Sequence, residues 1–553
     1  MVDPAMQDVD VLVVGAGGAG MTAALTCAHR GLRVVIVEKA EYFGGNTARS
    51  GGGVWIPGNY ALKRDTRADS LDEAKRYLDS IVGDVVPKSR RDTYIDQGPA
   101  MMEFVRKHTP VRFKWVPDYS DYHPEAPGGR ASGRSVEPVP INGHILGDEL
   151  ARLHPPYNKA PANMVVTQAN YRWMSLGART KRGPWTAAKV AARKMAAVAT
   201  HRRMYGTGNA LAIGLRKGLM DAGVPIVYGT ALQSLITKDG VVTGAVVLSE
   251  GTEQQIAVRK GVILAAGGFE KSAELREKHL AQPTSTAWST GAPTNEGDAI
   301  LAGIATGAAT DLMDDAWWGP TIPLPRNSWF CLAERNLPGS ILVNGVGERF
   351  MNEAMPYVEA GQAMYAAEAT GVKHIPCWLV FDQEYRSRYL FAGLPPSFPI
   401  PKKWIESGVI NKAATLEELA GQIDVPVDAL TATVERFNAM AARGVDEDFK
   451  RGQSAYELYY ADPTNKPNPS LGALKRAPFY AVQIVPGDLG TKGGLVTDAR
   501  ARVLRPDGSV IPGLYAAGNT SSAVMGRTYA GPGATIGPAM VFGYLAALDL
   551  AGG

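Results

Sequence analysis

Residues 11–38 constrain this chain more than any other part of its sequence. They form an apolar run (11–14), a GAGGAG turn, a helical run (21–29) and a β-branched run (34–37) that ends at Glu38. Such apolar runs are typical of strands buried on both faces of a parallel sheet. The glycines let backbone approach a pyrophosphate, the helix N-terminus offers it free N–H groups, and the acid can accept hydrogen bonds from ribose hydroxyls. The segment predicts a Rossmann-like α/β fold that binds a dinucleotide.

Glycine-rich turns elsewhere in the chain predict further parts of the same site. The apolar runs 262–270 and 513–519 both lead into glycines, as strands do where they reach a nucleotide. A Gly-Pro-Gly turn at 531–533 precedes a closing helix, 539–550, whose free N–H groups would face a ligand. Segment 43–53 contains too much glycine for a helix interior, so it predicts a loop that lies against a flat ligand.

Composition excludes several classes of protein. A chain of 553 residues exceeds one hydrophobic core and predicts two domains, and its net charge of +4 does not indicate a polyanionic partner. Cys27, Cys331 and Cys377 form no metal-binding pattern, so no metal is expected and the three suit small core positions in a reducing compartment. The sequence has neither a signal-peptide pattern nor an apolar run of membrane-spanning length. A cytoplasmic protein is predicted.

The segment between Glu149 and Asp221 contains no acidic residue, yet eleven Lys and Arg lie between positions 152 and 203. Aromatic residues are interleaved with them, which suits an anionic lipid surface. A helix at 186–203 would place basic residues near one face, although its apolar side is mostly Ala. Nucleic acid would need the same charges, but no reader motif accompanies them, so none is predicted as a partner. Peripheral membrane contact and a merely solvated insertion both remain open.

Six motifs occur in the order GGNTARSGGG, ILAAGG, GERFMNEAMPY, GTKGGL, GLYAAGNT and TYAGPGATIGPAMVFGYLAA. Together with the glycine turn they resemble the fumarate-reductase-like flavoproteins and, among these, the bacterial 3-ketosteroid Δ1-dehydrogenases. The resemblance covers nearly the whole chain except the basic segment at about 152–205. It implies a discontinuous FAD-binding domain, residues 1–283 and 487–553, with an inserted α+β catalytic domain at 284–486.

The resemblance also implies the residues that hold FAD. Covalently flavinylated relatives carry a His where this chain has Asn46, so non-covalent FAD is expected. The expected cofactor-binding residues are Gly15, Gly17, Gly18, Ala19, Gly20, Glu38, Lys39, Gly45, Asn46, Thr47, Ser50, Gly51, Gly52, Ala231, Ala266, Gly267, Gly268, Gly518, Asn519 and Ile536.

Four residues match the catalytic positions of these dehydrogenases. Tyr357 matches the base that takes the steroid C2 proton, and Tyr119 the tyrosine that assists it. Tyr529 and Gly533 match the pair that hydrogen-bonds the 3-keto oxygen, while flavin N5 receives the C1 hydride. Because a free phenol has a pKa of about 10, we hypothesise that Tyr119 and local dipoles lower the pKa of Tyr357. The implied partners are a 3-ketosteroid and an electron acceptor, with a quinone as candidate.

Three other functions fit parts of the pattern. The FAD frame also suits 3-ketosteroid 4(5α)-dehydrogenation. Fumarate-reductase-like chemistry is less well matched, because Lys492 and Tyr529 occupy the neighbourhoods of the dicarboxylate-binding Arg and His. A non-catalytic, membrane-associated flavin-binding protein is the alternative from a different class.

Overall fold

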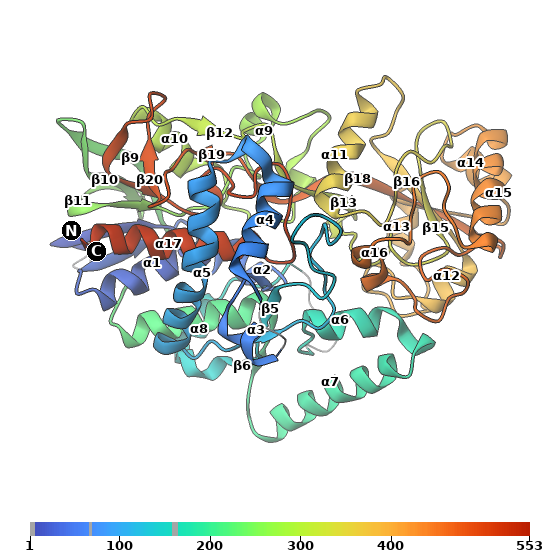
Figure 1. Ribbon diagram of the computed structural model, residues 1–553, viewed down its shortest axis with the longest axis horizontal. Coiled ribbons are helices and arrows are strands. Elements are labelled where there is room, and N and C mark those ends of the chain that lie inside the picture. The colour runs from blue at the N-terminus through green and yellow to red at the C-terminus, as the bar shows by residue number, and fades with distance from the viewer. Residues whose placement is uncertain (1–5, 66–68, 158–163, 553) are drawn as a thin grey trace.

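The computed structural model describes residues 6–65, 69–157 and 164–552, and two sheets dominate it (Figure 1). The first sheet has the strand order β20-β21-β11-β1-β2-β8, extended by β10 and β9. Its strands are β1 (Val9–Val14), β2 (Val34–Val37), β8 (Ile226–Val227), β9 (Thr230–Lys238), β10 (Val241–Ser249), β11 (Thr252–Leu264), β20 (Arg502–Leu504) and β21 (Val510–Ala516). Strands from both ends of the sequence therefore form one sheet.

The centre of this sheet is parallel, as the apolar runs predict. Val13 of β1 pairs with Ile263 of β11 on one side and with Ile36 of β2 on the other. Helices α1 (Gly18–His29) and α17 (Ile536–Leu550) cover one face and bury its side chains, and α8 (Thr207–Asp221) and α5 (Lys88–His108) pack on these two helices. The carboxyl ends of β1, β2, β11 and β21 lie at one edge of the sheet, where ligands of such folds bind.

The second sheet is antiparallel, in the order β14-β13-β18-β16-β15 with β17 beside β18. Its strands are β13 (Ala316–Ile322), β14 (Trp329–Phe330), β15 (Ser340–Val343), β16 (Cys377–Asp382), β17 (Ile410–Ala413) and β18 (Phe479–Thr491). One face packs on α11 (Tyr357–Glu368), the other on α14 (Leu416–Gln422) and α15 (Val427–Arg443). The sequence did not predict these strands, because residues buried on both faces show no alternation. β18 crosses the expected boundary at 486/487, and the division into domains stays a prediction.

Two local expectations are corrected. Segment 43–53 is not wholly a loop, because α2 (Gly45–Arg49) forms one helical turn that packs on α8. Gly44 precedes it with φ of +104°, so the glycine starts the turn and Asn46 to Arg49 continue it. Cys27, Cys331 and Cys377 are buried, which confirms their expected core positions.

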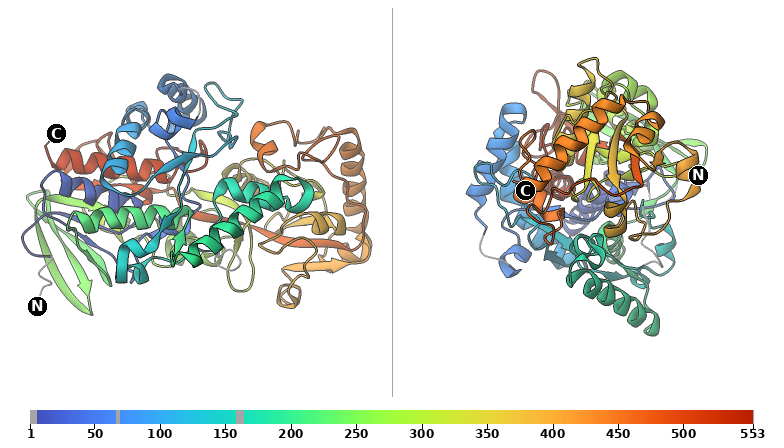
Figure 2. Two further views of the ribbon diagram at one scale, coloured as in Figure 1. Left: turned by 90° about the horizontal axis from the view of Figure 1, so that it is seen from below. Right: turned by 90° about the vertical axis from the view of Figure 1, so that its right-hand side faces the viewer.

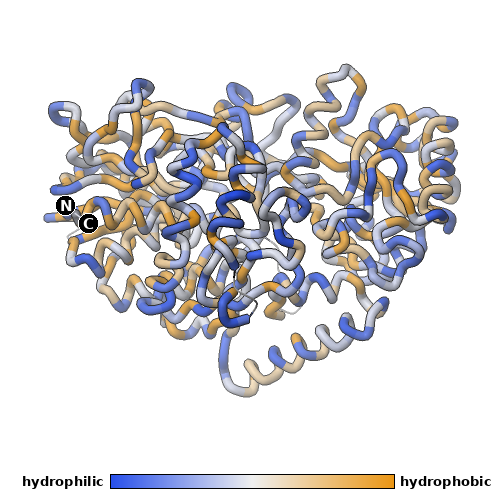
Figure 3. Tube along the Cα trace, in the orientation of Figure 1, coloured by the Kyte–Doolittle hydropathy of each residue, from blue (hydrophilic) through white to orange (hydrophobic). Residues whose placement is uncertain are grey.

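The basic segment forms α6 (Gln168–Ser175) and α7 (Arg182–Ala199), and α7 projects from the body of the molecule (Figure 2). Residues 158–163 lie outside the described part. Only one narrow side of α7 is buried, and it consists of Gly183, Thr186, Val190 and Ala197. Hydrophobic and hydrophilic residues alternate along its length (Figure 3). The large apolar side chains Trp185, Met195 and Val198 are 62%, 66% and 61% exposed.

Candidate active site

The glycine turn after β1 is shaped for a phosphate group. Gly15 has φ of +105°, and a Cβ on it would lie 2.4 Å from the Ala265 carbonyl oxygen. A Cβ on Gly17 would meet nothing within 4 Å, so open space lies in front of that backbone. α1 begins next to it at Gly18, with no side-chain cap and no acidic residue in its first turn. Its free N–H groups and positive dipole end suit an anion.

Glu38 stands at the end of β2, where the sequence predicts it. Its carboxylate accepts hydrogen bonds from the Ala16 N–H at 2.7 Å and the Ala40 N–H at 2.9 Å. Burial raises its pKa. The Thr230 N–H donates to the Glu38 carbonyl at 2.9 Å, which brings the neighbouring Ala231 to the same place. Lys39, also expected here, directs its ammonium group to Glu296 and Asp298 instead.

The α2 turn closes over the glycine turn. The Gly18 N–H donates to Thr47 Oγ1 at 3.1 Å. Further along, Ser50 Oγ accepts from the Gly52 N–H at 2.9 Å and donates to the Thr47 carbonyl at 2.8 Å. Asn46 Nδ2 donates to Glu270 Oε1 at 2.8 Å, so α2 is tied to the segment that follows β11. The structure thus brings together the expected residues of segments 15–20, 45–52 and 266–268.

The expected residues near the C-terminus lie beside this group. Thr520 Oγ1 donates to the Gly267 carbonyl at 2.9 Å, and Trp317 Nε1 donates to Asn519 Oδ1 at 3.2 Å. A small cavity of about 20 Å³ is lined by Trp317, Gly518, Asn519, Thr535 and Pro538, next to the start of α17 at Ile536. The helix N-terminus and the Glu38 carboxylate fit the pyrophosphate and the ribose of a flavin dinucleotide.

The aromatic rings of three buried tyrosines meet beyond that cavity. Tyr357 is the first residue of α11, and its ring centroid lies 5.4 Å from that of Tyr529. Tyr122 contacts both, at 5.4 Å from Tyr357 and 5.2 Å from Tyr529. Thr535 Oγ1 donates to the Tyr529 hydroxyl at 3.1 Å. We call Tyr119, Tyr122, Tyr357 and Tyr529 the tyrosine cluster.

Gly533 lies within reach of this cluster, and only glycine fits its position. Its φ is +96°, and a Cβ would lie 2.3 Å from the Gly53 carbonyl carbon. The Gly533 carbonyl accepts from the Trp55 N–H at 3.2 Å. Its own N–H acts on the Tyr529 hydroxyl and tends to lower that pKa. The Tyr529 phenol and the Gly533 main-chain N–H are therefore neighbours.

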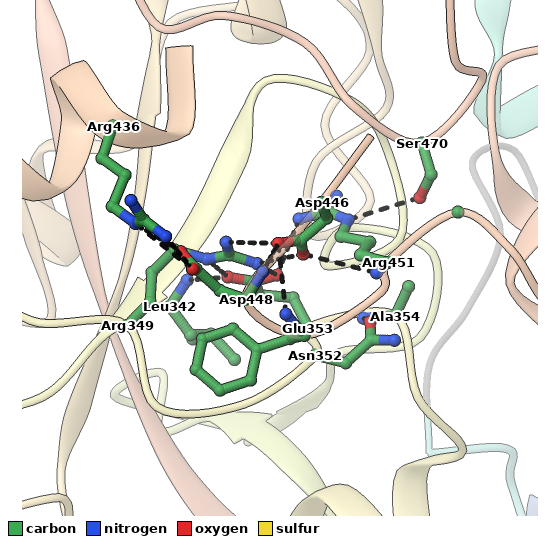
Figure 4. Close-up of polar contacts among 12 residues, drawn as sticks. Leu342, Arg349, Asn352, Glu353, Ala354, Arg436, Asp446, Asp448, Arg451 and Ser470 are labelled. Carbon is green, nitrogen blue, oxygen red and sulfur yellow. Dashed lines mark hydrogen bonds and ion pairs between the residues drawn. The ribbon is translucent and has the colours of Figure 1, made fainter. Parts of the chain in front are cut away.

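An ion network holds the chain that leads into Tyr357 (Figure 4). Buried Glu353 accepts two hydrogen bonds from Arg349, both at 2.8 Å, and one from Arg451 at 3.1 Å. Arg349 also binds Asp446 at 2.8 Å. The two guanidinium groups outweigh burial and hold the pKa of Glu353 below its ordinary value. Glu353 therefore stays ionised and fixes segment 349–356 on the second sheet.

Comparison with known proteins identifies the family of this chain. A family model described as FAD binding domain matches residues 10–536. The chain is 56% identical over 555 residues to 3-oxosteroid 1-dehydrogenase of Mycolicibacterium smegmatis, with 99% of this chain and 97% of the relative covered. The chain belongs to the 3-oxosteroid 1-dehydrogenase family. The enzyme of Mycobacterium tuberculosis is likewise 56% identical, over 99% of both chains.

A solved structure supports this membership. 3-Ketosteroid Δ1-dehydrogenase of Sterolibacterium denitrificans, in complex with 1,4-androstadiene-3,17-dione, matches with a TM-score of 0.94 and 40% identity. The match covers 98% of this chain and 99% of that one. The fold class, FAD as cofactor and the predicted FAD-dependent 3-oxosteroid 1-dehydrogenase activity are thereby confirmed.

The tyrosine ring that contacts Tyr357 is not the one that the sequence predicts. Tyr122, not Tyr119, has its ring against Tyr357. Tyr119 lies one step further out: its hydroxyl is 3.5 Å from that of Tyr122 and accepts from Tyr460 at 3.0 Å. An aromatic residue three positions away on an irregular loop carries no sequence signal of which ring faces inward.

The hypothesis of a lowered pKa at Tyr357 is wrong for this structure. Burial raises the pKa of Tyr357 well above 10, and the nearby Tyr529 and Tyr119 raise it further. Only the Tyr122 hydroxyl acts in the opposite direction. Burial likewise raises the pKa of Tyr119 to about 12 and also raises that of Tyr529. All of these phenols are therefore neutral and can donate hydrogen bonds at neutral pH.

No helix in the described part of the chain combines the length and the hydrophobicity needed to cross a bilayer.

Proposed function

We propose that this FAD-dependent dehydrogenase introduces the C1–C2 double bond into 3-ketosteroids with Tyr357 as base and with Tyr529 and Gly533 as the donors to the 3-keto oxygen. One observation supports these roles above all. The rings of Tyr357 and Tyr529 are 5.4 Å apart, and the Gly533 N–H reaches the Tyr529 hydroxyl. The rings that carry the base and the phenol donor are therefore neighbours, as binding to one ketone and its α carbon requires.

The chemistry assigns a task to each residue. Negative charge gathers on the ketone oxygen as the α proton leaves, and the Tyr529 O–H and Gly533 N–H stabilise it. Donors fixed in advance toward such an oxygen are usually worth about 2.7–4 kcal/mol each. Tyr357 takes the C2 proton. FAD, when bound, supplies the hydride acceptor for C1.

The base must ionise in spite of its burial. Tyr122 is the neighbour that acts to lower the pKa of Tyr357, so we assign to it the assisting role that the sequence suggests for Tyr119. Tyr119 and Tyr460 continue the line of hydroxyls away from the steroid. Trp317 and Phe330 flank the cluster at 5.0 Å from Tyr529 and 5.1 Å from Tyr357, and offer flat apolar walls to the steroid rings.

Turnover of androst-4-ene-3,17-dione with an artificial electron acceptor tests the proposed function. The purified enzyme should form the 1,4-diene, whereas a 4(5α)-dehydrogenase has no bond to desaturate in this substrate. Tyr357→Phe is the matched variant, which should retain FAD and bind steroid yet lose turnover. An active Tyr357→Phe enzyme would contradict the assignment of the base.

We also propose that α7 attaches the protein peripherally to the cytoplasmic side of an anionic membrane. A quinone is the electron acceptor that we propose. The outward face of α7 carries Trp185, Met195 and Val198, and no acidic residue lies between Glu149 and Asp221. An exposed apolar face bordered by cations is the pattern of helices that lie in a membrane interface. The neighbouring α6 stacks Arg172 over Tyr459 at 4.2 Å, and Tyr459 stacks in turn on Tyr119 of the tyrosine cluster.

Vesicle co-sedimentation tests this attachment. The protein should bind phosphatidylserine-containing vesicles at low salt and phosphatidylcholine vesicles weakly. Since each basic residue contributes about 1 kcal/mol, Lys189→Gln with Lys194→Gln should weaken binding about 30-fold. The matched control is Lys402→Gln with Lys475→Gln on the other lobe, which should bind like the wild type. Equal losses in the two double variants would contradict a role for α7.

A further inference from the structure

Three polar side chains that the reaction does not use meet behind the tyrosine cluster. They are His123, Glu359 and Thr528, and each lies one or two residues from a tyrosine of the cluster. They come from three different segments: the loop after β4 (Phe113–Trp115), the first turn of α11, and the loop before α17. We call these three residues the polar clamp.

A single carboxylate oxygen joins the three segments. Thr528 Oγ1 donates to Glu359 Oε1 at 2.8 Å. His123 Nε2 lies 3.1 Å from the same oxygen and 2.9 Å from Thr528 Oγ1. One turn further along α11, Gln362 Nε2 donates to the Arg527 carbonyl at 2.7 Å. α11 therefore holds the chain next to Tyr529 at two successive residues.

The carboxylate at the centre is charged. Burial acts to raise the pKa of Glu359, but the hydrogen bond and charge of His123, together with Thr528, hold it below its ordinary value. Hydrogen bonds to an ionised acceptor are about twice as strong as neutral ones. In the described part of the chain, the second oxygen, Oε2, is buried without a hydrogen-bond partner. Such an oxygen costs stability, so the group is poorly explained as a purely stabilising feature.

We propose that the polar clamp sets the distance between Tyr357 and Tyr529, and thereby between the base and the donor to the ketone. His123, Glu359 and Thr528 are positioning residues, because they act through the tyrosines that follow or precede them. Reaction rates depend steeply on such distances, and a displacement of 1 Å can cost about 100-fold. Loosening the clamp should therefore slow the chemical step and leave steroid affinity unchanged.

The experiment rests on the proposed function and compares five variants with the wild type. Glu359→Ala removes the central acceptor, whereas Glu359→Gln keeps an oxygen that Thr528 and His123 can bind. Thr528→Val removes the hydroxyl at nearly constant shape, and Thr528→Ser retains it. The control is Glu435→Gln, on an exposed position of α15. FAD content, melting temperature, KM and kcat are measured for each.

The expected result is a kcat that is about 10-fold to 100-fold lower in Glu359→Ala and Thr528→Val, with FAD content and KM unchanged. Glu359→Gln and Thr528→Ser should recover most of that loss. A wild-type kcat in Glu359→Ala and Thr528→Val overturns the inference. So does a loss in Glu359→Gln as large as in Glu359→Ala, because charge and not hydrogen bonding would then matter. If Glu359→Ala does not fold, Thr528→Val alone decides. A wild-type enzyme inactive on the steroid refutes the proposed function instead.

Discussion

Replacing Tyr529 by Phe isolates one hydroxyl group of the active site. The ring keeps its neighbours, since Trp317 at 5.0 Å and Tyr357 at 5.4 Å contact it through their own rings. Only the O–H is lost, and with it the hydrogen bond from Thr535 at 3.1 Å and the contact with the Gly533 N–H. The variant therefore separates donation to the ketone from packing.

The two losses differ in size and in the quantity that reports them. Without its phenol donor the transition state should rise by about 2.7–4 kcal/mol, which lowers kcat by roughly 100-fold to 1000-fold. The missing partner of Thr535 should cost about 1 kcal/mol of folding stability. The first loss depends on charge that develops on the ketone oxygen, so steroid binding in the ground state should change little.

Anaerobic reduction of the flavin by saturating steroid measures the chemical step directly, and thermal unfolding measures stability. Tyr459→Phe is the matched control, because it also removes one buried tyrosine hydroxyl, and that hydroxyl has no hydrogen-bond partner among the described residues. The control should reduce its flavin at the wild-type rate. If Tyr529→Phe reduces its flavin within threefold of wild type, the phenol is not a donor to the developing oxyanion and the reasoning fails.

Two further predictions follow from the pKa shifts. Burial raises the pKa of Tyr357 well above 10, so kcat/KM should rise about tenfold per pH unit from pH 7 to 10. A plateau of kcat/KM near pH 8 would mean that Tyr357 of the steroid-free enzyme ionises more easily than its burial implies. The pKa values of Glu353 and Asp446 are lowered, so their contribution to stability is complete above their ordinary values, 4.5 and 3.8, and is lost as pH falls below them. Glu353→Ala leaves Arg349 and Arg451 buried with one partner fewer, so it should lower the free energy of unfolding by roughly 3–5 kcal/mol. Denaturant unfolding at pH 7 measures this loss. The stability of the variant should also fall less steeply in acid than that of the wild type.

The nucleotide-binding unit could be predicted because its physical requirements are local. A buried strand, a turn that only glycine can make and an acid at the next strand end all lie within residues 11–38. The antiparallel strands β13, β15 and β16 could not, since continuous apolar runs buried on both faces look alike in strands and helices. α2 was not predicted for a related reason: Gly44 and Gly45 stand at the start of the helical turn and do not interrupt it.

The catalytic group shows the same limit. Motifs identified Tyr357, Tyr529 and Gly533, which the structure brings together. They did not reveal that Tyr122 lies between Tyr119 and Tyr357, because this depends on how an irregular loop folds over the rings of another lobe. The exposed apolar face of α7 was also hidden, since helical periodicity identifies a face and does not say whether protein or solvent covers it.

Strand β18 limits how the steroid can enter. It pairs with β16 and β17 along its first half and with β13 along its second, and then ends at Thr491, whose hydroxyl accepts from the Phe269 N–H at 3.0 Å. One continuous strand therefore runs from the second sheet to the edge of the flavin site. A hinge between the two sheets at this point would have to break the contact between Thr491 and Phe269. We expect the substrate to enter by local rearrangement of loops around a rigid frame. The rate of entry should then depend on those loops and not on a hinge motion between lobes.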